Sequence, residues 1–132
     1  MDKIYYPTSE KIIEYNILVL TLIKLKKSDK PRLLSYQKLC NTIEACKNKE
    51  GDIYDKATVL LKGLIQGHPF ASGNRRTAFV STKNFVTKNK SKFMIQDHPA
   101  QAKIMTGIRE GFYTDEEIKE WIKYGQIREF KR

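Results

Sequence analysis

Apolar side chains recur every three or four residues along most of this chain. The clearest stripe consists of Ile53, Ala57, Leu60, Leu61 and Leu64. This spacing places apolar side chains on one face of an α-helix, and such a face is stable only when it packs against other elements. The pattern therefore predicts an all-α fold with little strand.

Signals at the ends of these stripes divide the chain into about six helices. The expected helices run from Thr8 or Ser9 to about Lys27, from Tyr36 to Lys47, from Asp52 to about Gly67, from Gly73 to about Lys88, from Pro99 to Gly111, and from Thr114 through Ile122. Asp52 is suited to an N-cap, and Thr114 opens a capping box. Pro69 restricts the residue before it to extended conformations, so the third helix should end there. Residues 32–35 and 92–95 are expected to be short extended pieces, the second of them a brief strand.

The composition predicts one domain over residues 1–132. Of these residues 40% are hydrophobic, which is enough for one packed core. The spacing of Cys40 and Cys46 matches no zinc site or redox pair, which favours reduced thiols. The start of the sequence lacks the apolar core of a signal peptide, and the longest apolar run, Ile17–Leu20, is too short to span a bilayer. We expect a soluble, cytoplasmic protein without a membrane partner.

The chain carries a formal net charge of +10. Such a surplus attracts polyanions, including nucleic acid and nucleotides. Lysines scattered evenly over a solvated surface produce the same number without any ligand. Charge therefore leaves a basic nucleic-acid binder open as a function class and does not select it.

Residues 67–76 lie between two predicted apolar helices and combine the features of an anion site. Asn74 and the two arginines after it occupy the first turn of the second helix, where unpaired N–H groups and a partial positive charge attract anions. Arginines add planar donors that match phosphate oxygens, and Gly73 lets the backbone approach a ligand closely. His68 lies six residues before Asn74, near enough to reach a group bound at this anion site. It is a plausible general base there, because histidine titrates near neutral pH.

Each of these residues also has a plain structural interpretation. His68 can simply end a helix, and Phe70 is expected to be a core anchor that fixes the loop. Arg75 and Arg76 can be a solvated pair, although positive charge at a helix start opposes the helix dipole and so favours a bound anion. His98 is expected to belong to a turn or a helix cap.

Residues 68–78 read His-Pro-Phe-Ala-Ser-Gly-Asn-Arg-Arg-Thr-Ala. This string resembles the signature of the Fic/Doc family, in particular its Doc (death-on-curing) branch, which usually reads His-Pro-Phe-x-Asp-Gly-Asn-Lys-Arg-Thr-Ala. Similar stretches extend the likeness over most of residues 50–124. The resemblance implies a Fic/Doc-type helical domain with at most a short β-hairpin flap. The flap, which would dock the target as an extended strand, is placed near residues 32–36.

The resemblance implies transfer of a phosphate-containing group from ATP or another nucleoside triphosphate to a Ser, Thr or Tyr hydroxyl of a target protein. Doc-type members phosphorylate their target and act as toxins held by an antitoxin, whereas Fic-type members transfer AMP. Carried over, His68 takes the proton of the hydroxyl. Asn74, the backbone around Gly73, and Arg76 hold the nucleotide phosphates, and Arg75 keeps the charge of the Doc lysine.

Two positions depart from the family pattern. Ser72 occupies the place of the acidic residue that binds magnesium, and a hydroxyl is a poorer ligand than a carboxylate for a hard divalent cation. Metal binding and phosphoryl transfer should both weaken as a result. Phe79 stands where Fic enzymes carry a second arginine, which argues against AMP transfer.

Several functions follow from these features. The leading hypothesis is a Doc-like phosphotransferase, with a nucleotidyltransferase as its variant and Mg²⁺ as a doubtful cofactor. The alternative is a catalytically weak or inactive member of the fold that works by binding a nucleotide or a protein. The third is the basic nucleic-acid binder.

Overall fold

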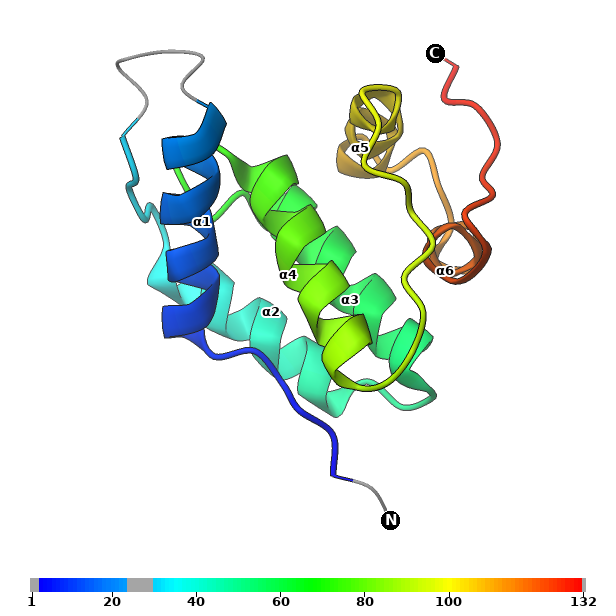
Figure 1. Cartoon of the computed structure of the whole chain (residues 1–132), viewed down its shortest axis with the longest axis horizontal. Helices are drawn as coiled ribbons and strands as arrows, with labels where there is room; N and C mark the ends of the chain where they lie inside the picture. Colours follow the sequence, from blue (N-terminus) through cyan, green and yellow to red (C-terminus); the bar gives the residue numbers. More distant parts are fainter. Residues whose placement is uncertain (1–2, 24–29, 132) are drawn as a thin grey trace.

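The computed structural model describes residues 3–23 and 30–131, and over these residues the chain forms six α-helices (Figure 1). They are α1 (Ser9–Ile23), α2 (Tyr36–Asn48), α3 (Ile53–Gly67), α4 (Asn74–Lys88), α5 (Gln101–Arg109) and α6 (Asp115–Tyr124). The predicted all-α fold of about six helices is confirmed. The predicted end of the first helix near Lys27 lies outside the described residues.

Helix α3 is the centre of the fold because it packs against α2, α4, α5 and α6. Figure 1 shows α1 and α2 on one side of the α3–α4 pair and α5 and α6 on the other. A helix surrounded in this way must be apolar around much of its circumference. Accordingly, Ala57, Leu60, Leu61, Leu64 and Ile65 are at most 1% exposed. The α3–α4 pair is thereby rigidly held, and it carries the predicted functional loop between its two helices.

Side-chain caps fix several helix starts at the predicted residues. Thr8 Oγ1 accepts a hydrogen bond from the first turn of α1 at 3.1 Å. Asp52 and Asp55 form a capping box at the start of α3, and Thr114 and Glu117 form another at the start of α6. These bonds occupy backbone N–H groups that a helix start otherwise leaves without a partner.

The brief strand predicted at residues 92–95 is wrong, because this segment is irregular in the structure. Met94 N donates to the Ile122 carbonyl of α6 at 2.8 Å, so a helix end takes the place of a partner strand. Within the described residues the β-structure is an isolated antiparallel bridge between Leu33 and Phe70. Helix α5 also begins two residues after Pro99, at Gln101.

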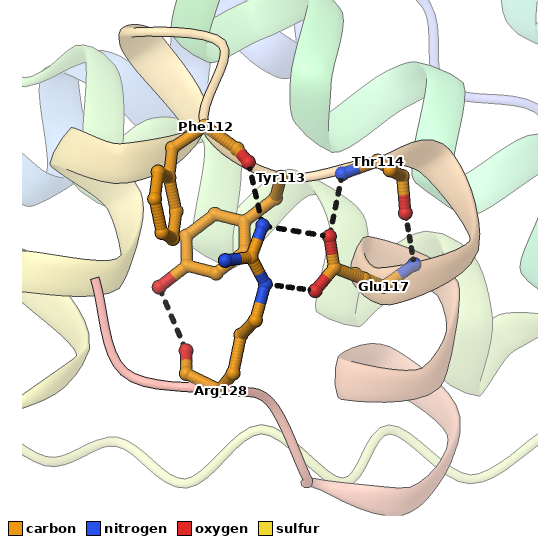
Figure 2. A network of polar contacts seen from close by, with 5 residues as sticks. All are labelled: Phe112, Tyr113, Thr114, Glu117 and Arg128. Atoms are coloured by element: carbon orange, nitrogen blue, oxygen red, sulfur yellow. Dashed lines mark hydrogen bonds and ion pairs between the residues drawn. The ribbon is translucent and has the colours of Figure 1, made fainter. Parts of the chain in front are cut away.

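A network around Arg128 holds the C-terminal residues against α6 (Figure 2). Its guanidinium donates to the Glu117 carboxylate and to the Phe112 carbonyl, and it lies 4.0 Å from the centroid of the Phe112 ring. The Tyr113 hydroxyl donates to the Arg128 carbonyl at 2.9 Å. The hydrogen bonds that Glu117 accepts from Arg128 and from the backbone N–H of Thr114 lower the pKa of its carboxyl group to about 2. The tail is thereby held where Phe130, 6% exposed, can pack into the core.

Both cysteines are free thiols. Cys46 is buried, and burial raises the pKa of its thiol to about 11, whereas Cys40 is half-buried. In the part of the chain that the structure describes, no helix has the length and apolar character needed to cross a membrane.

Candidate functional site

A pocket of about 750 Å³ lies at the loop between α3 and α4. The loop from His68 and the first turn of α4 form one wall, and residues 97–99 with α5 form another. The lining includes the predicted catalytic, metal and phosphate-binding positions His68, Ser72, Gly73, Asn74, Arg75 and Arg76. Phe70 instead faces the core at 1% exposure, the placement expected of a loop anchor.

Two residues in the left-handed backbone region shape the loop. His68, the C-cap of α3, has φ 49° and ψ 55°, although a residue before proline was expected to be extended. Gly73, the N-cap of α4, has φ 76°. A Cβ atom added to Gly73 would lie 3.1 Å from Leu20 Cδ2 of α1. The backbone conformation therefore favours glycine here, and a Cβ atom would require the Leu20 side chain to shift by a few tenths of an ångström.

Asn74 braces the loop from within. Its buried side chain accepts a hydrogen bond from Phe70 N at 3.0 Å and donates to the Phe70 carbonyl at 2.7 Å. Its Nδ2 also lies 3.1 Å from His68 Nδ1. The orientation of the amide is fixed because the Phe70 N–H can only donate and the Phe70 carbonyl can only accept. The side chain of Asn74 thus ties the end of α3 to the start of α4.

The same contact determines which nitrogen of His68 remains for a ligand. Because Nδ2 of Asn74 donates, Nδ1 of His68 accepts, and the neutral ring carries its hydrogen on Nε2. The side chain of His68 is exposed and lines the pocket. Its Nε2 is therefore a hydrogen-bond donor in the resting ring. It becomes a base only if the hydrogen moves to Nδ1, which removes the acceptor for Asn74.

Helix α1 contributes a buried polar residue to the support of this loop. Asn16 is 1% exposed, and its Nδ2 donates to the Ser72 carbonyl at 2.9 Å and to Thr77 Oγ1 at 3.1 Å. These contacts join α1 to the residues on both sides of Gly73. The conformation of the loop therefore depends on a helix distant in sequence.

The segment before α2 supports the loop from its other side. Leu34 N donates to the Pro69 carbonyl at 2.8 Å, and Ala71 N donates to the Arg32 carbonyl at 2.9 Å. This pairing uses the residues near which the flap was predicted. The docking of a target along this segment stays a prediction.

The two arginines predicted to bind phosphate have different partners. Arg75 Nη1 donates to Thr106 Oγ1 of α5 at 3.0 Å. Arg76 makes a bidentate ion pair with Asp97, with Nη1–Oδ1 at 2.5 Å and Nη2–Oδ2 at 2.7 Å. Its guanidinium lies 5.1 Å from the centroid of the Phe79 ring. The hydrogen bonds between Arg76 and Asp97 raise the pKa of the arginine and lower the pKa of the aspartate.

The start of α4 has the electrostatic character of an anion site. Thr77 N donates to the Gly73 carbonyl at 2.8 Å and closes the first turn of the helix. The amides of residues 74–76 lie before this bond and therefore have no acceptor within the helix. Arg109 of α5 lines the same pocket as Arg75 and Arg76. The helix dipole and these guanidinium groups favour a negatively charged ligand.

The pocket does not supply the ligands that magnesium prefers. Mg²⁺ in nucleotide sites is usually held by one or two carboxylates together with phosphate oxygens. Among the described residues of the lining, Asp97 alone carries a carboxylate, and both of its oxygens accept hydrogen bonds from Arg76. Ser72 offers a hydroxyl where the resemblance to Fic/Doc proteins implies an acidic residue. The described part of the chain also contains no group of three or more His, Cys, Asp or Glu side chains able to hold a metal ion.

Sequence reasoning missed several residues of this site, among them Asn16, Asp97 and Arg109. Asn16 interrupts the apolar stripe of the first helix, and a polar residue at such a position signals a buried, hydrogen-bonded side chain. Asp97 carries no comparable signal, because it lies in an irregular segment 21 residues after its partner Arg76. His98 was expected in a turn or cap, and its Nδ1 accepts a hydrogen bond from Ala100 N just before α5. It also lines the pocket.

Comparison with known proteins gives one family. The sequence model of the Fic/DOC family matches residues 26–86, just under half of the chain. The matched stretch includes α2, α3, the loop and most of α4. No curated protein matches the chain. Over this stretch, which holds the loop, the chain is similar to the Fic/DOC family, and its all-helical fold agrees with that likeness.

Proposed function

We propose that the chain is a transferase of the Fic/Doc type, which moves a phosphate-containing group from a nucleoside triphosphate to a hydroxyl of a target protein. The observation that carries the proposal is the joint placement of His68 and the first turn of α4 on one pocket. The Asn74 side chain holds the two together by its hydrogen bond to the ring. A group bound at the helix start therefore lies within the same pocket as an exposed imidazole.

The residues of the pocket suggest a division of roles. The amides at the start of α4, with Arg75 and Arg76, hold the phosphates and stabilise the charge that builds up during transfer. His68 receives the proton of the target hydroxyl on Nε2 after its own hydrogen has moved to Nδ1. This rearrangement costs the hydrogen bond from Asn74, so we expect slow turnover.

Within this function, phosphoryl transfer by a Doc-like toxin is the favoured form. Phe79, which occupies the place of the second arginine of Fic enzymes, is 3% exposed and packs beneath Arg76. Position 79 therefore supplies no guanidinium that could bind the phosphates of a nucleotide in this pocket. The same proposal includes an antitoxin that binds and inhibits this chain, and a cytoplasmic location for it.

The test is transfer of label from ATP to protein in a cell lysate. Label from γ-labelled ATP supports phosphoryl transfer, whereas label only from α-labelled ATP moves the assignment to AMP transfer. His68→Asn is the sharper variant, because asparagine tolerates the left-handed backbone of this position better than alanine. It should abolish labelling and leave the unfolding midpoint near that of the wild type. Labelling that survives both His68→Asn and His68→Ala contradicts the proposal.

A binding module without transferase activity is the second candidate. It is favoured by Ser72 at the family's metal position and by the engagement of His68 Nδ1 with Asn74. It predicts nucleotide binding without label transfer, and Ser72→Asp should then raise activity. If the wild type transfers label and Ser72→Asp changes nothing, the weakness attributed to Ser72 is refuted.

A further inference from the structure

We propose that the pocket binds the polyphosphate of a nucleotide without a divalent cation, and that the ligand displaces the Asp97 carboxylate from Arg76. The inference deepens the proposed function, because it assumes that the ligand of the pocket is a nucleotide. It specifies the charge state of that ligand and the residue with which the ligand competes.

The first argument is the mismatch between this pocket and a magnesium site. The side chain of Asp97 already accepts both Arg76 bonds, and its Oδ1 accepts a further bond from Gln101 Nε2 at 3.1 Å. A cation would have to draw this carboxylate away from a guanidinium. The backbone carbonyl of Ser72 already accepts a hydrogen bond from Asn16 Nδ2 at 2.9 Å. The side chain at this position offers a hydroxyl, which is a weak ligand for Mg²⁺.

The second argument is that arginines can neutralise phosphate in place of a metal. Arg75, Arg76 and Arg109 all line the pocket, and the start of α4 adds its partial positive charge. Guanidinium groups bind phosphate oxygens in pairs, as Arg76 binds the oxygens of Asp97. Free ATP carries more negative charge than its magnesium complex, so a pocket of this composition favours the free form.

The third argument concerns the ease of exchange at Arg76. The side chains of Arg76 and Asp97 are 38% and 53% exposed, so solvent and salt screen their attraction even though the pair is bidentate. Asp97 precedes α5 in an irregular segment, so its carboxylate can turn away without moving a helix. Arg76 remains supported by the Phe79 ring when Asp97 leaves. A phosphate group can therefore take the position of the carboxylate.

The metal test is isothermal titration of the full chain with ATP, in excess EDTA and again in millimolar Mg²⁺. The wild type should bind equally well or more tightly in EDTA. Ser72→Asp should reverse the order, because the added carboxylate repels free ATP and supplies the missing ligand. Binding by the wild type that strengthens by more than about fivefold when Mg²⁺ is added overturns the inference.

The competition test compares two variants that remove the same charge. Asp97→Asn should tighten ATP binding by about fivefold in EDTA, the factor that corresponds to an exposed ion pair. Asp115→Asn is the matched control, because Asp115 pairs with Lys62 at 2.8 Å outside the pocket lining. It should change the affinity by less than about twofold, as expected for a distant, screened charge.

Each outcome of these titrations has a defined meaning. If Asp97→Asn binds no more tightly than Asp115→Asn, or binds more weakly than the wild type, the competition is refuted. If Asp97→Asn binds no ATP at all, the inference fails as well. If it binds tightly but no variant transfers label, the inference stands and the proposed transferase activity fails.

Discussion

The replacement Asn16→Ala should loosen the functional loop from a distance. Asn16 belongs to α1, yet its Nδ2 donates to the Ser72 carbonyl and to Thr77 Oγ1, on either side of Gly73. Alanine removes both hydrogen bonds. Because Asn16 is 1% exposed, water cannot readily replace its amide in the unrelaxed structure.

The expected loss follows from these contacts. Each intramolecular hydrogen bond contributes about 1 kcal/mol, and a buried group left without its partner adds to the cost. The small cavity left by the side chain adds a further fraction. The free energy of unfolding should therefore fall by about 2–3 kcal/mol. For a chain of this size, that corresponds to a decrease of roughly 10 °C in the thermal midpoint.

Urea denaturation and calorimetry measure this loss, and ATP titration measures its effect on the site. Asn84→Ala is the matched control, because Asn84 Nδ2 donates to the Val80 carbonyl one turn earlier in α4. That bond is local, and alanine is the better helix former, so the control should change stability by less than about 0.5 kcal/mol. A loss below about 1 kcal/mol for Asn16→Ala, or one equal to the control, refutes the bracing role.

Three further predictions concern the backbone, a buried lysine and pH. Gly73→Ala should lower the free energy of unfolding by about 1–2 kcal/mol, because φ is 76° at this position, and the affinity for ATP should fall as well. A urea denaturation curve equal to that of the wild type would contradict this prediction. Lys56 is 7% exposed, and its Nζ donates to the carbonyls of Lys47 and Lys49, so Lys56→Met should destabilise the chain by about 1 kcal/mol in urea. The pKa of Glu117 is about 2 against an ordinary 4.5, so its contribution is present above pH 4.5 and is lost as the pH falls towards 2. Midpoints measured across that range should fall less for Glu117→Gln, and parallel curves would contradict the assignment.

Local sequence signals were sufficient for the helices, because the signals act over a few residues. The capping residues Asp52 and Thr114 occupy the predicted positions and bond to amides three residues away. Ala57, Leu60, Leu61 and Leu64 of the α3 stripe are buried as the periodicity indicates, and Ile53 is half-buried. The strand expected at residues 92–95 failed for the opposite reason, since β-propensity produces a strand only where a partner strand is available. Here the nearest partner is the Ile122 carbonyl at the end of α6.

Local patterns in the sequence predicted the helices, the loop between α3 and α4, and several loop residues that line the pocket. The partners of these loop residues depend on how the helices pack in space. Asn16 reaches the loop from 56 residues away, and Asp97 reaches Arg76 from 21 residues away. A hydrogen bond depends on the distance between two atoms in space, and periodicity or capping patterns carry no information about contacts at such separations. For this reason the loop could be recognised from its residues, whereas the charge balance of the pocket required the fold.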